Sequence, residues 1–563
     1  MKRYQWFLVL AAVAVCMGVL IACKKNQTDQ AETGQETKEL VLYRGDGAQA
    51  VLVYPADASE ELLGAAGEIQ AAYRSVTGAE LPAYPEGSVP EGYTAEIHLG
   101  GTAAAIAQGI PSEVSYFHYL CCVREGELFL YVNQEQALSA LTVAFELALP
   151  DRFANGALTV AADWQLTGFL KTEALLANIP NYDGGTSVSA FDCDNGHEML
   201  LITGADLSSF NAYCDKVASL GYTLRNRNEM NGNPACTFTN SKGVMLHAYL
   251  SAHSGEARLV VSKTAAVQDQ PLTSGEYETL LYPLKAGGGM GYVFRLNDGS
   301  FLIYDGGYRT EACLNELMQV LKDLAPDPSQ ITIACWVLTH GHIDHVGTFL
   351  AFAERYAADS TVTIQSFMHN MCLTEEQARY IDTNTWTETR EAIERFFPDA
   401  EVYTPLTGQI YHFGNAAVEI LFTMEDYMPR VIENESDAVT PDDKKGNANI
   451  QSVVSRVSVN GHTLLMMADT TSVCCDEMCD RYGDYLRSEY VQTAHHGISD
   501  TRPRAQNATK EIYALIQPSY ALMPCSAKRL DGYMATELNT YLATFLKGDV
   551  ICSGNYLTTI PLK

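Results

Sequence analysis

The sequence predicts an α/β protein, with one large C-terminal α/β domain that follows two small α/β or α+β domains. The chain has 563 residues, and at about 100 to 200 residues per domain this length predicts about three domains. Short apolar strands alternate with amphipathic helices over the last half of the chain, an order typical of an α/β sheet. Hydrophobic residues make up 47% of the chain, which is enough for each domain to bury a core. The expected segments are 1–22, 23–38, 39–164, 165–272 and 273–563.

The first segment has the pattern of an export signal. Lys2 and Arg3 precede the apolar run Trp6–Ile21, which is too short and too poorly flanked for a transmembrane helix. The small residue before Cys23 resembles the end of a bacterial lipobox, and this resemblance implies cleavage just before Cys23 and lipidation of its thiol. The protein would then be extracytoplasmic and anchored by lipid to the bacterial cell membrane, with a plain secretion signal as the alternative. Residues 24–38 are polar and lack apolar periodicity, so we expect a flexible tether.

The charge balance bears on the binding partners. The formal net charge is −31, which favours solubility and repels polyanions at long range. Sequence-independent DNA binding normally needs clustered lysine and arginine side chains, and the sequence has no such run. Nucleic acid is therefore a disfavoured substrate class, and nothing in the sequence indicates the oligomeric state.

Fifteen cysteines are many for an exported protein. Spacings such as Cys121-Cys122 and Cys474-Cys475-x-x-x-Cys479 do not match a paired C-x-x-C framework. We expect buried free thiols, with disulfide pairing as the alternative.

The segment 39–164 is expected to be a small α/β domain. Runs rich in Val, Leu and Tyr predict strands, and apolar residues at helical spacing predict helices. The predicted strands are 39–43, 50–54, 95–100 and 127–132, and the predicted helices are 59–76 and 134–149.

Four parts of this segment resemble the small α/β domain that precedes the catalytic barrel in α-glucuronidases and hexosaminidases. They are Val51–Pro55, Ala65–Tyr73, Thr77–Pro82 and Ile97–Gly100. The resemblance implies an accessory domain associated with carbohydrate enzymes, and no catalytic residue carries over.

The segment 165–272 is expected to be a small α+β domain without a chemical motif. Helical spacing predicts a helix over 205–220, which the break at Gly221 ends. Three apolar runs predict an antiparallel meander with strands at 234–240, 244–251 and 257–262.

The segment 273–563 is expected to form one unit of two βα halves. Its predicted strands are 301–304, 331–338, 362–367, 418–422, 462–467 and 490–493. Its predicted helices are 311–324, 348–357, 387–397 and 509–516.

The chemistry is concentrated in residues 336–347, with the sequence WVLTHGHIDHVG. His340, His342, Asp344 and His345 fall within six residues, directly after an apolar strand. Neighbours on a helix point around its axis, so we expect a loop to bring all four together. The carboxyl ends of strands in open α/β sheets are where ligands bind. Imidazole and carboxylate groups together suit zinc, with manganese or iron as alternatives.

This H-x-H-x-D-H pattern resembles the signature of the metallo-β-lactamase superfamily. The resemblance implies the αβ/βα four-layer fold of that family and a metal-dependent hydrolase. Three further landmarks follow the family order. Asp305, in IYDGG, would support the metal loops, and Asp469, in LLMMADT, would bridge two metal ions. His495 and His496, in AHHG, resemble the final motif of the DNA-uptake protein ComEC and its extracellular relatives; one of them should bind metal, with a slight preference for His495.

The family pattern divides the ligands between two sites. His340 and His342 would begin the first site, and Asp344 and His345 would form the second with one histidine of the pair. Asp469 would lie between the sites, so the resemblance implies one or two divalent cations, with zinc expected.

One departure from the family concerns the first site. The family often supplies a third histidine about two dozen residues before the bridging aspartate, but residues 445–452 have the sequence KGNANIQS. This Asn-and-Ser segment is itself similar to the ComEC group. His369 follows a predicted strand and is a candidate substitute, although an ordinary pocket or surface histidine is the competing interpretation.

The expected reaction is hydrolysis by a water that the metal activates, with Asp344 orienting the nucleophile and moving its proton. The AHHG ending and the Asn-rich segment favour a phosphodiester. The substrate would be a small molecule or a cell-surface polymer. The alternatives are a lactone, thioester or β-lactam hydrolase, or a non-catalytic glycan-binding lipoprotein.

Overall fold

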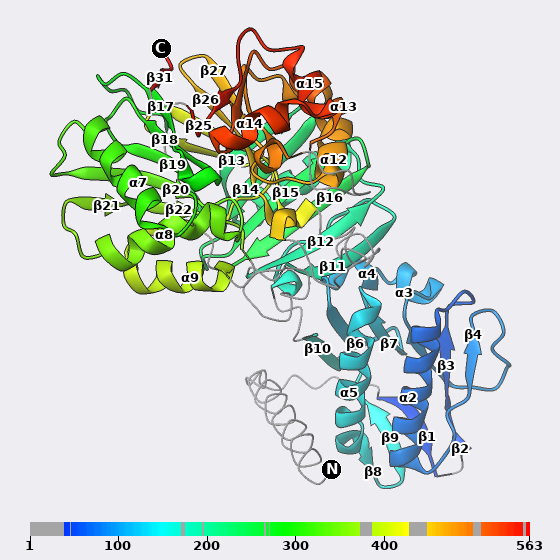
Figure 1. The fold of residues 1–563 in the computed structure, drawn as a ribbon. Coiled ribbons are helices and arrows are strands. Elements are labelled where there is room, and N and C mark those ends of the chain that lie inside the picture. The colour runs from blue at the N-terminus through cyan, green and yellow to red at the C-terminus, as the bar shows by residue number, and fades with distance from the viewer. Residues whose placement is uncertain are drawn as a thin grey trace, which may run out of the picture. The chain divides into compact units, whose positions relative to one another are not determined.

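The computed structural model describes ten stretches of the chain: 39–45, 47–170, 175–193, 196–263, 266–268, 271–371, 385–426, 448–498, 508–555 and 559–563. The expected signal, Cys23 and tether lie outside these residues. The chain divides into two compact units (Figure 1). The first contains residues up to Val114 together with His118–Gly168, and the second contains Ser115–Phe117 and Phe169–Lys563. In the described part of the chain, no helix has the length and apolar content that a membrane crossing requires.

The first unit contains two sheets. One has the order β2-β1-β9-β8, and the other has the order β10-β6-β7-β5-β3-β4. The strands are β1 (Leu40–Arg44), β2 (Gly47–Ala48), β3 (Ala50–Tyr54), β4 (Ala83–Pro85), β5 (Ala95–Leu99), β6 (His118–Arg124), β7 (Glu127–Val132), β8 (Phe153–Ala154), β9 (Ala157–Val160) and β10 (Gln165–Phe169). The helices are α2 (Glu60–Thr77), α3 (Ala103–Ala107), α4 (Ile110–Glu113) and α5 (Leu138–Ala148). The expected helices and strands of this unit are confirmed. The remaining elements were not predicted: β2, β4, β6, β8, β9, β10, α3 and α4.

The second unit begins with an antiparallel six-stranded sheet of order β11-β12-β16-β15-β14-β13. Its elements are β11 (Ser187–Asp192), β12 (His197–Thr203), α6 (Leu207–Ser219), β13 (Thr223–Met230), β14 (Asn233–Thr239), β15 (Met245–Ser251) and β16 (Glu256–Ser262). The predicted helix and the antiparallel meander β14-β15-β16 are confirmed.

A mixed sheet follows, with the order β23-β22-β20-β19-β18-β17-β31 and with β21 paired to β20. Its strands are β17 (Leu280–Pro283), β18 (Gly291–Arg295), β19 (Phe301–Asp305), β20 (Ile331–Val337), β21 (Val362–Ile364), β22 (Ser366–Met368), β23 (Glu401–Tyr403) and β31 (Ile560–Pro561). Its helices are α7 (Glu311–Leu324), α8 (Ile343–Tyr356) and α9 (Thr385–Phe396). Strands β19, β20, β22 and β23 are parallel, so their carboxyl ends share one edge.

A further sheet has the order β24-β25-β26-β27-β28-β29-β30. Its strands are β24 (Ile410–Phe413), β25 (Ala416–Phe422), β26 (Val454–Val459), β27 (His462–Met466), β28 (Tyr490–Gln492), β29 (Tyr520–Met523) and β30 (Ile551–Cys552). Its helices are α12 (Ser472–Tyr482), α13 (Lys510–Ile516), α14 (Ala527–Met534) and α15 (Glu537–Ala543). Strands β27 to β30 are parallel.

Three apolar cores hold these two sheets and their helices together. One core packs α7, α8 and α9 against β19, β20 and β22 through residues such as Leu317, Phe349 and Trp336. A second core joins the two sheets to each other, with Tyr304 and Val457 among its members. A third packs α12, α13 and α15 against the other side of the later sheet. Figure 1 shows the two helix groups on opposite sides of the paired sheets.

Buried charges connect the six-stranded sheet to this body. The Arg481 guanidinium on α12 donates to Asp426 Oδ1 at 2.9 Å and to Glu477 Oε1 at 2.7 Å. It also lies 5.6 Å from the ring of Tyr249 on β15. The His247 ring on the same strand donates from Nε2 to the carbonyl oxygen of Thr407, 2.9 Å away. These contacts tie the sheet to the larger body by polar groups as well as by packing.

The cysteines of the described residues are free thiols, and nearly all of them are buried. This agrees with the expectation of buried free thiols.

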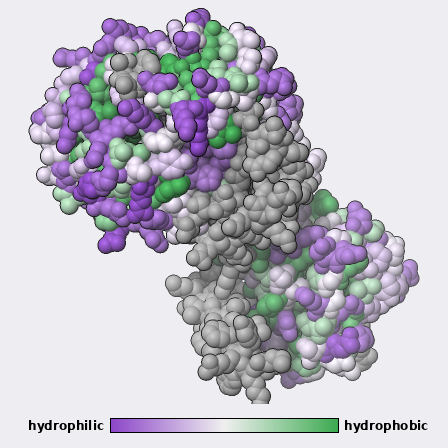
Figure 2. Space-filling model, viewed as in Figure 1, coloured by the Kyte–Doolittle hydropathy of each residue, from purple (hydrophilic) through white to green (hydrophobic). Residues whose placement is uncertain are grey.

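In Figure 2, hydrophilic side chains cover much of the visible face, interspersed with smaller hydrophobic groups.

Candidate metal centre

The first loop of the site leaves the carboxyl end of β20 and runs into α8. His340 and His342 lie in the turn, and His342 is the N-cap of the helix. Asp344 and His345 belong to the first helical turn, so the expectation that all four residues lie in a loop, with the helix starting at 348, is wrong. A carboxylate in the first turn is favoured because the helix N-terminus carries partial positive charge. The turn and the helix start together make the four side chains converge.

The second half of the site lies at the carboxyl ends of β27 and β28. Asp469 follows β27, and the histidine pair lies in a short 3₁₀ turn, Ala494–Gly497, after β28. Ala468, His495 and His496 have φ angles of 48°, 48° and 60°. This left-handed region is uncommon for residues other than glycine, and such residues cluster at functional sites.

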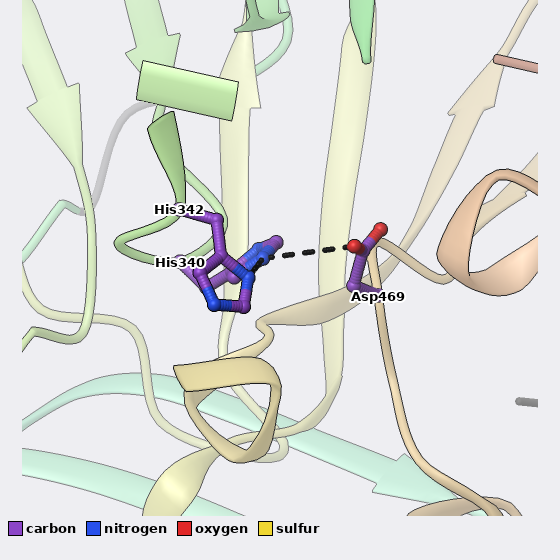
Figure 3. A group of neighbouring side chains, drawn as sticks. All are labelled: His340, His342 and Asp469. Carbon is purple, nitrogen blue, oxygen red and sulfur yellow. Dashed lines mark hydrogen bonds and ion pairs between the residues drawn. The ribbon is translucent and has the colours of Figure 1, made fainter. Parts of the chain in front are cut away.

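The two halves meet in two groups of ligand atoms. His340, His342 and Asp469 form the first group, and Asp344, His345 and His496 form the second. In the first group, His340 Nε2 lies 3.0 Å from His342 Nδ1 and 3.8 Å from Asp469 Oδ2. Figure 3 shows His340 directed at Asp469 from the other half of the site, with the His342 ring beside it.

The second group is held more closely around buried atoms. His496 Nε2 lies 3.1 Å from Asp344 Oδ2. The Asp469 carboxylate reaches this group as well, with His345 Nε2 3.3 Å from Oδ1 and His496 Nε2 3.5 Å from Oδ2. Asp469 therefore touches both groups, in the position that the sequence assigned to a bridging aspartate.

The histidine of the second group is His496, whereas the sequence slightly favoured His495. His495 Nε2 is 3.8 Å from Asp469 Oδ2, and its side chain is 23% exposed against 6% for His496. His495 therefore lies at the rim of the site.

The buried donor atoms fit a divalent cation. His345 Nε2, His496 Nε2 and Asp469 Oδ1 are buried and make no hydrogen bond, although all three face the same point between the loops. Two atoms that each bind a tetrahedral zinc at about 2.0 Å lie about 3.3 Å apart, which matches the distance from His345 Nε2 to Asp469 Oδ1. Imidazole nitrogen and carboxylate oxygen are the ligand types that zinc, manganese and iron accept.

The far nitrogen of each buried histidine is fixed by another partner. His345 Nδ1 donates to Asp305 Oδ2 at 2.8 Å, and His496 Nδ1 donates to the carbonyl oxygen of Pro524 at 2.8 Å. Thr339 Oγ1 donates to Asp305, so it accepts from His340 Nδ1 at 3.1 Å. Each ring therefore presents Nε2 to the site, as metal-binding histidines do when another group holds their second nitrogen.

Asp305 holds the first loop through several hydrogen bonds. It is fully buried, and Oδ1 accepts from the backbone N–H of Thr339 at 2.8 Å. Its own carbonyl oxygen accepts from the indole N–H of Trp336 at 2.8 Å. Asp305 therefore supports the loop that carries His340 to His345, and it belongs to neither of the two ligand groups.

Sequence reasoning missed the residues that support the second half. The Gln492 side chain bonds to both the N–H and the carbonyl oxygen of Ala468, and Ser452 Oγ accepts from the N–H of Asp469 at 3.3 Å. Ser452 belongs to the Asn-and-Ser segment that lacks the family's third histidine, so this segment braces the bridging residue. A buried glutamine directly before the histidine motif was the available signal for Gln492.

The charges of the site attract positive charge. Burial raises the pKa of Asp469, but the surrounding histidines His345, His496 and His495 lower it well below its usual value. Burial lowers the pKa of His496, but Asp469 and Asp344 raise it to about 9. A cation would replace these protons, so its binding should weaken as the pH falls.

His369 belongs to none of the ligand groups found among the described residues. Its backbone N–H donates to the carbonyl oxygen of Tyr403 at 3.1 Å. Burial and then the charge of Arg390 lower its pKa to about 4, so the ring is neutral near pH 7.

The comparisons with known proteins cover part of the chain. No curated protein matches the chain significantly. Among similar solved structures is the metallo-beta-lactamase fold protein YhfI from Bacillus subtilis, at 14% identity, with 50% of this chain and 97% of that chain covered and a TM-score of 0.29. Zn²⁺-bound PqqB from Methylobacterium extorquens is 9% identical over 51% of this chain and 100% of that chain, with a TM-score of 0.32. Unliganded yeast PDE1 is 9% identical over 49% and 97%, with a TM-score of 0.32. The family comparison is more specific: residues 285–364, which include Asp305 and the whole 340–345 cluster, match the model of the metallo-beta-lactamase superfamily.

Proposed function

We propose that the chain is an extracytoplasmic, metal-dependent hydrolase that cleaves a phosphodiester. The observation that carries the proposal is the convergence of two His/Asp groups on Asp469, with the buried Nε2 atoms of His345 and His496 making no hydrogen bond. The match of residues 285–364 to the metallo-beta-lactamase superfamily supports the same chemistry. We further propose that the paired sheets and their outer helices form the αβ/βα four-layer arrangement of that family, with 39–164 and 165–272 as accessory domains.

A divalent cation at this site supplies a water whose pKa falls towards neutrality. His340, His342, Asp469, Asp344, His345 and His496 are the residues that would hold one or two such ions. Zinc is the expected ion, because three or more imidazoles meet here.

Asp344 is the residue best placed to orient the attacking water. Its side chain is 21% exposed, against 2% for Asp469, so solvent reaches it. Burial raises its pKa, but the close contact with His496 Nε2, 3.1 Å away, lowers the pKa well below its usual value. The ionised carboxylate can accept a hydrogen bond from water and direct the oxygen lone pair at the substrate.

A positive charge near the site favours an anionic substrate. Burial and the charge of Asp344 raise the pKa of Tyr308, whereas Arg529, on α14, lowers it, so both charges act on the same tyrosine. Arg529 on this helix is exposed and donates to the Tyr533 hydroxyl at 3.3 Å. The guanidinium can pair with a phosphodiester oxygen in two hydrogen bonds.

The location and the class of phosphodiester rest on the sequence. The apolar start and Cys23 support a lipid-anchored protein, and the ComEC-like AHHG ending supports a phosphodiester. The net charge of −31 disfavours long nucleic acids. We therefore propose a cell-surface polymer or a small sugar phosphodiester as substrate.

The test is turnover of bis-p-nitrophenyl phosphate by the zinc-loaded protein, compared with a chromogenic β-lactam, a lactone and a thioester. We expect hydrolysis of the phosphodiester that His342→Ala abolishes, and a higher KM with little change in kcat for Arg529→Gln. Preferential hydrolysis of a lactone, thioester or β-lactam would overturn the substrate class. If the purified protein holds no metal, and the His342→Ala variant binds cell-wall glycan as well as the wild type does, the proposal of an enzyme is wrong.

A further inference from the structure

We propose that Glu96, His98 and Glu127 of the first unit form a second binding site for a divalent transition-metal ion, independent of the centre around Asp469. Glu96 and His98 are alternate residues of β5, so their side chains lie on one face of the sheet. Glu127 begins the adjacent parallel strand β7, and the pairing of Ile97 with Leu128 places it beside Glu96.

Such residues are unusual in this part of a sheet. Parallel strands are normally covered on both faces and are apolar along their length. Here β5 has the sequence AEIHL, and its neighbour starts with a glutamate on the same face. Two carboxylates and an imidazole side by side need a compensating positive charge.

His98 supplies the buried, unbonded atom of the group. Its side chain is 3% exposed, and Nε2 lies 3.3 Å from Glu96 Oε2 and 3.3 Å from Glu127 Oε2. Neither contact has the geometry of a hydrogen bond. The donor atoms of the three residues lie within 4.8 Å of one another. Ligands of a tetrahedral ion with bonds of about 2.0 Å are about 3.3 Å apart, which is the spacing of Nε2 from each carboxylate oxygen.

The other side of the ring is held in place. His98 Nδ1 lies 3.3 Å from Thr102 Oγ1, which also caps α3 by accepting from the N–H of Ala105. Phe129 stacks on the imidazole, with ring centroids 5.0 Å apart. A hydrogen bond at Nδ1 and a packed ring face are the supports that orient metal-binding histidines.

The ligand types limit which metal ions the site can bind. One imidazole with two carboxylates suits zinc, manganese or iron, whereas calcium and magnesium prefer oxygen alone. Glu96 and Glu127 are 41% and 40% exposed, so the ion is reached from solvent and keeps a position for water or an anionic ligand. The competing state is a protonated His98 between the two carboxylates.

The test counts zinc in the purified full chain. In a background with Asp469→Asn and His340→Gln, which removes the other centre, we expect one tightly bound equivalent of zinc by elemental analysis. Adding His98→Gln should remove that equivalent. His118→Gln, a change at another histidine of the same unit, should leave it in place. In the wild-type protein, His98→Gln should lower the zinc content by one equivalent.

A second pair of variants covers the case in which His98→Gln unfolds the unit. Glu96→Gln and Glu127→Gln change partly exposed side chains, so thermal unfolding in a chelator should stay unchanged. Each should weaken zinc binding at least ten-fold in a competition titration. If none of the three changes alters the zinc content or the zinc affinity, the proposed metal site is wrong. That result would favour the protonated histidine.

Discussion

Asp305 belongs to neither ligand group, yet replacing it with asparagine should weaken zinc binding at the centre around Asp469. Asp305 Oδ2 accepts from His345 Nδ1 and from Thr339 Oγ1, while Oδ1 accepts from the Thr339 N–H. Asparagine keeps one acceptor oxygen but presents an NH₂ group where the second oxygen was. That group would face one or more hydrogen-bond donors, so His345 loses its fixed tautomer and orientation.

The size of the effect follows from the bond that is lost. A hydrogen bond to a charged group contributes about 1.5 to 3 kcal/mol. If most of that energy serves to hold His345 in place for metal, affinity falls about 10- to 100-fold, since each tenfold costs about 1.4 kcal/mol. Asp305 is fully buried, so water cannot replace the missing acceptor.

The assay is zinc affinity by competition with a chromogenic chelator, with circular dichroism to verify the fold. Thr339→Val removes one partner of Asp305 but leaves the bond to His345, so its effect should be smaller. Asp327→Asn, in an exposed turn where Asp327 accepts from Ser329, is the matched control and should bind zinc normally. A folded Asp305→Asn protein with wild-type zinc affinity would refute the supporting role of Asp305.

Three other predictions concern stability, pH and the segment before β18 that packs against Asp344. Arg481→Met should destabilise the fold by about 3 to 5 kcal/mol in urea unfolding, because it leaves the buried Asp426 carboxylate without its closest cation; a loss below about 1 kcal/mol would contradict this. Burial lowers the pKa of His247 from 6.5 to about 4, so the unfolded chain takes up its proton first as the pH falls. Stability should therefore drop by about 2 kcal/mol more in wild type than in His247→Gln between pH 7.5 and pH 5, and parallel pH profiles for the two proteins would exclude it. Gly289→Ala would place a Cβ 2.2 Å from the carbonyl oxygen of Asp344, so zinc affinity should fall, and unchanged affinity in the chelator competition would show that the loop adjusts.

The long periodic elements could be predicted from sequence, because one buried face repeats along them. Helix α7 begins and ends where its apolar spacing predicted, and the apolar runs of β19 and β20 were also found. Strand β13 was missed because its sequence, TLRNRNEM, is polar and largely exposed at the edge of its sheet. The start of α8 was misplaced because the polar ligands that form its first turn look like a loop.

The ligand types could be predicted, but their partners could not. Four metal-binding side chains within six residues, directly after an apolar strand, indicate a metal site by their density alone. The choice between His495 and His496 depends on two left-handed residues in succession, which the sequence does not display. The support of His496 comes from the carbonyl oxygen of Pro524, and every residue has such a carbonyl.

The backbone at the histidine pair has a consequence for how this chain can vary over evolution. A left-handed conformation costs about 1 to 2 kcal/mol in a residue with a Cβ, and glycine or asparagine adopts it more readily. Drift in a protein with no use for the imidazoles should soon put those residues at positions 495 and 496. Histidine at both positions, despite this conformational cost, is what selection for the imidazole rings would maintain.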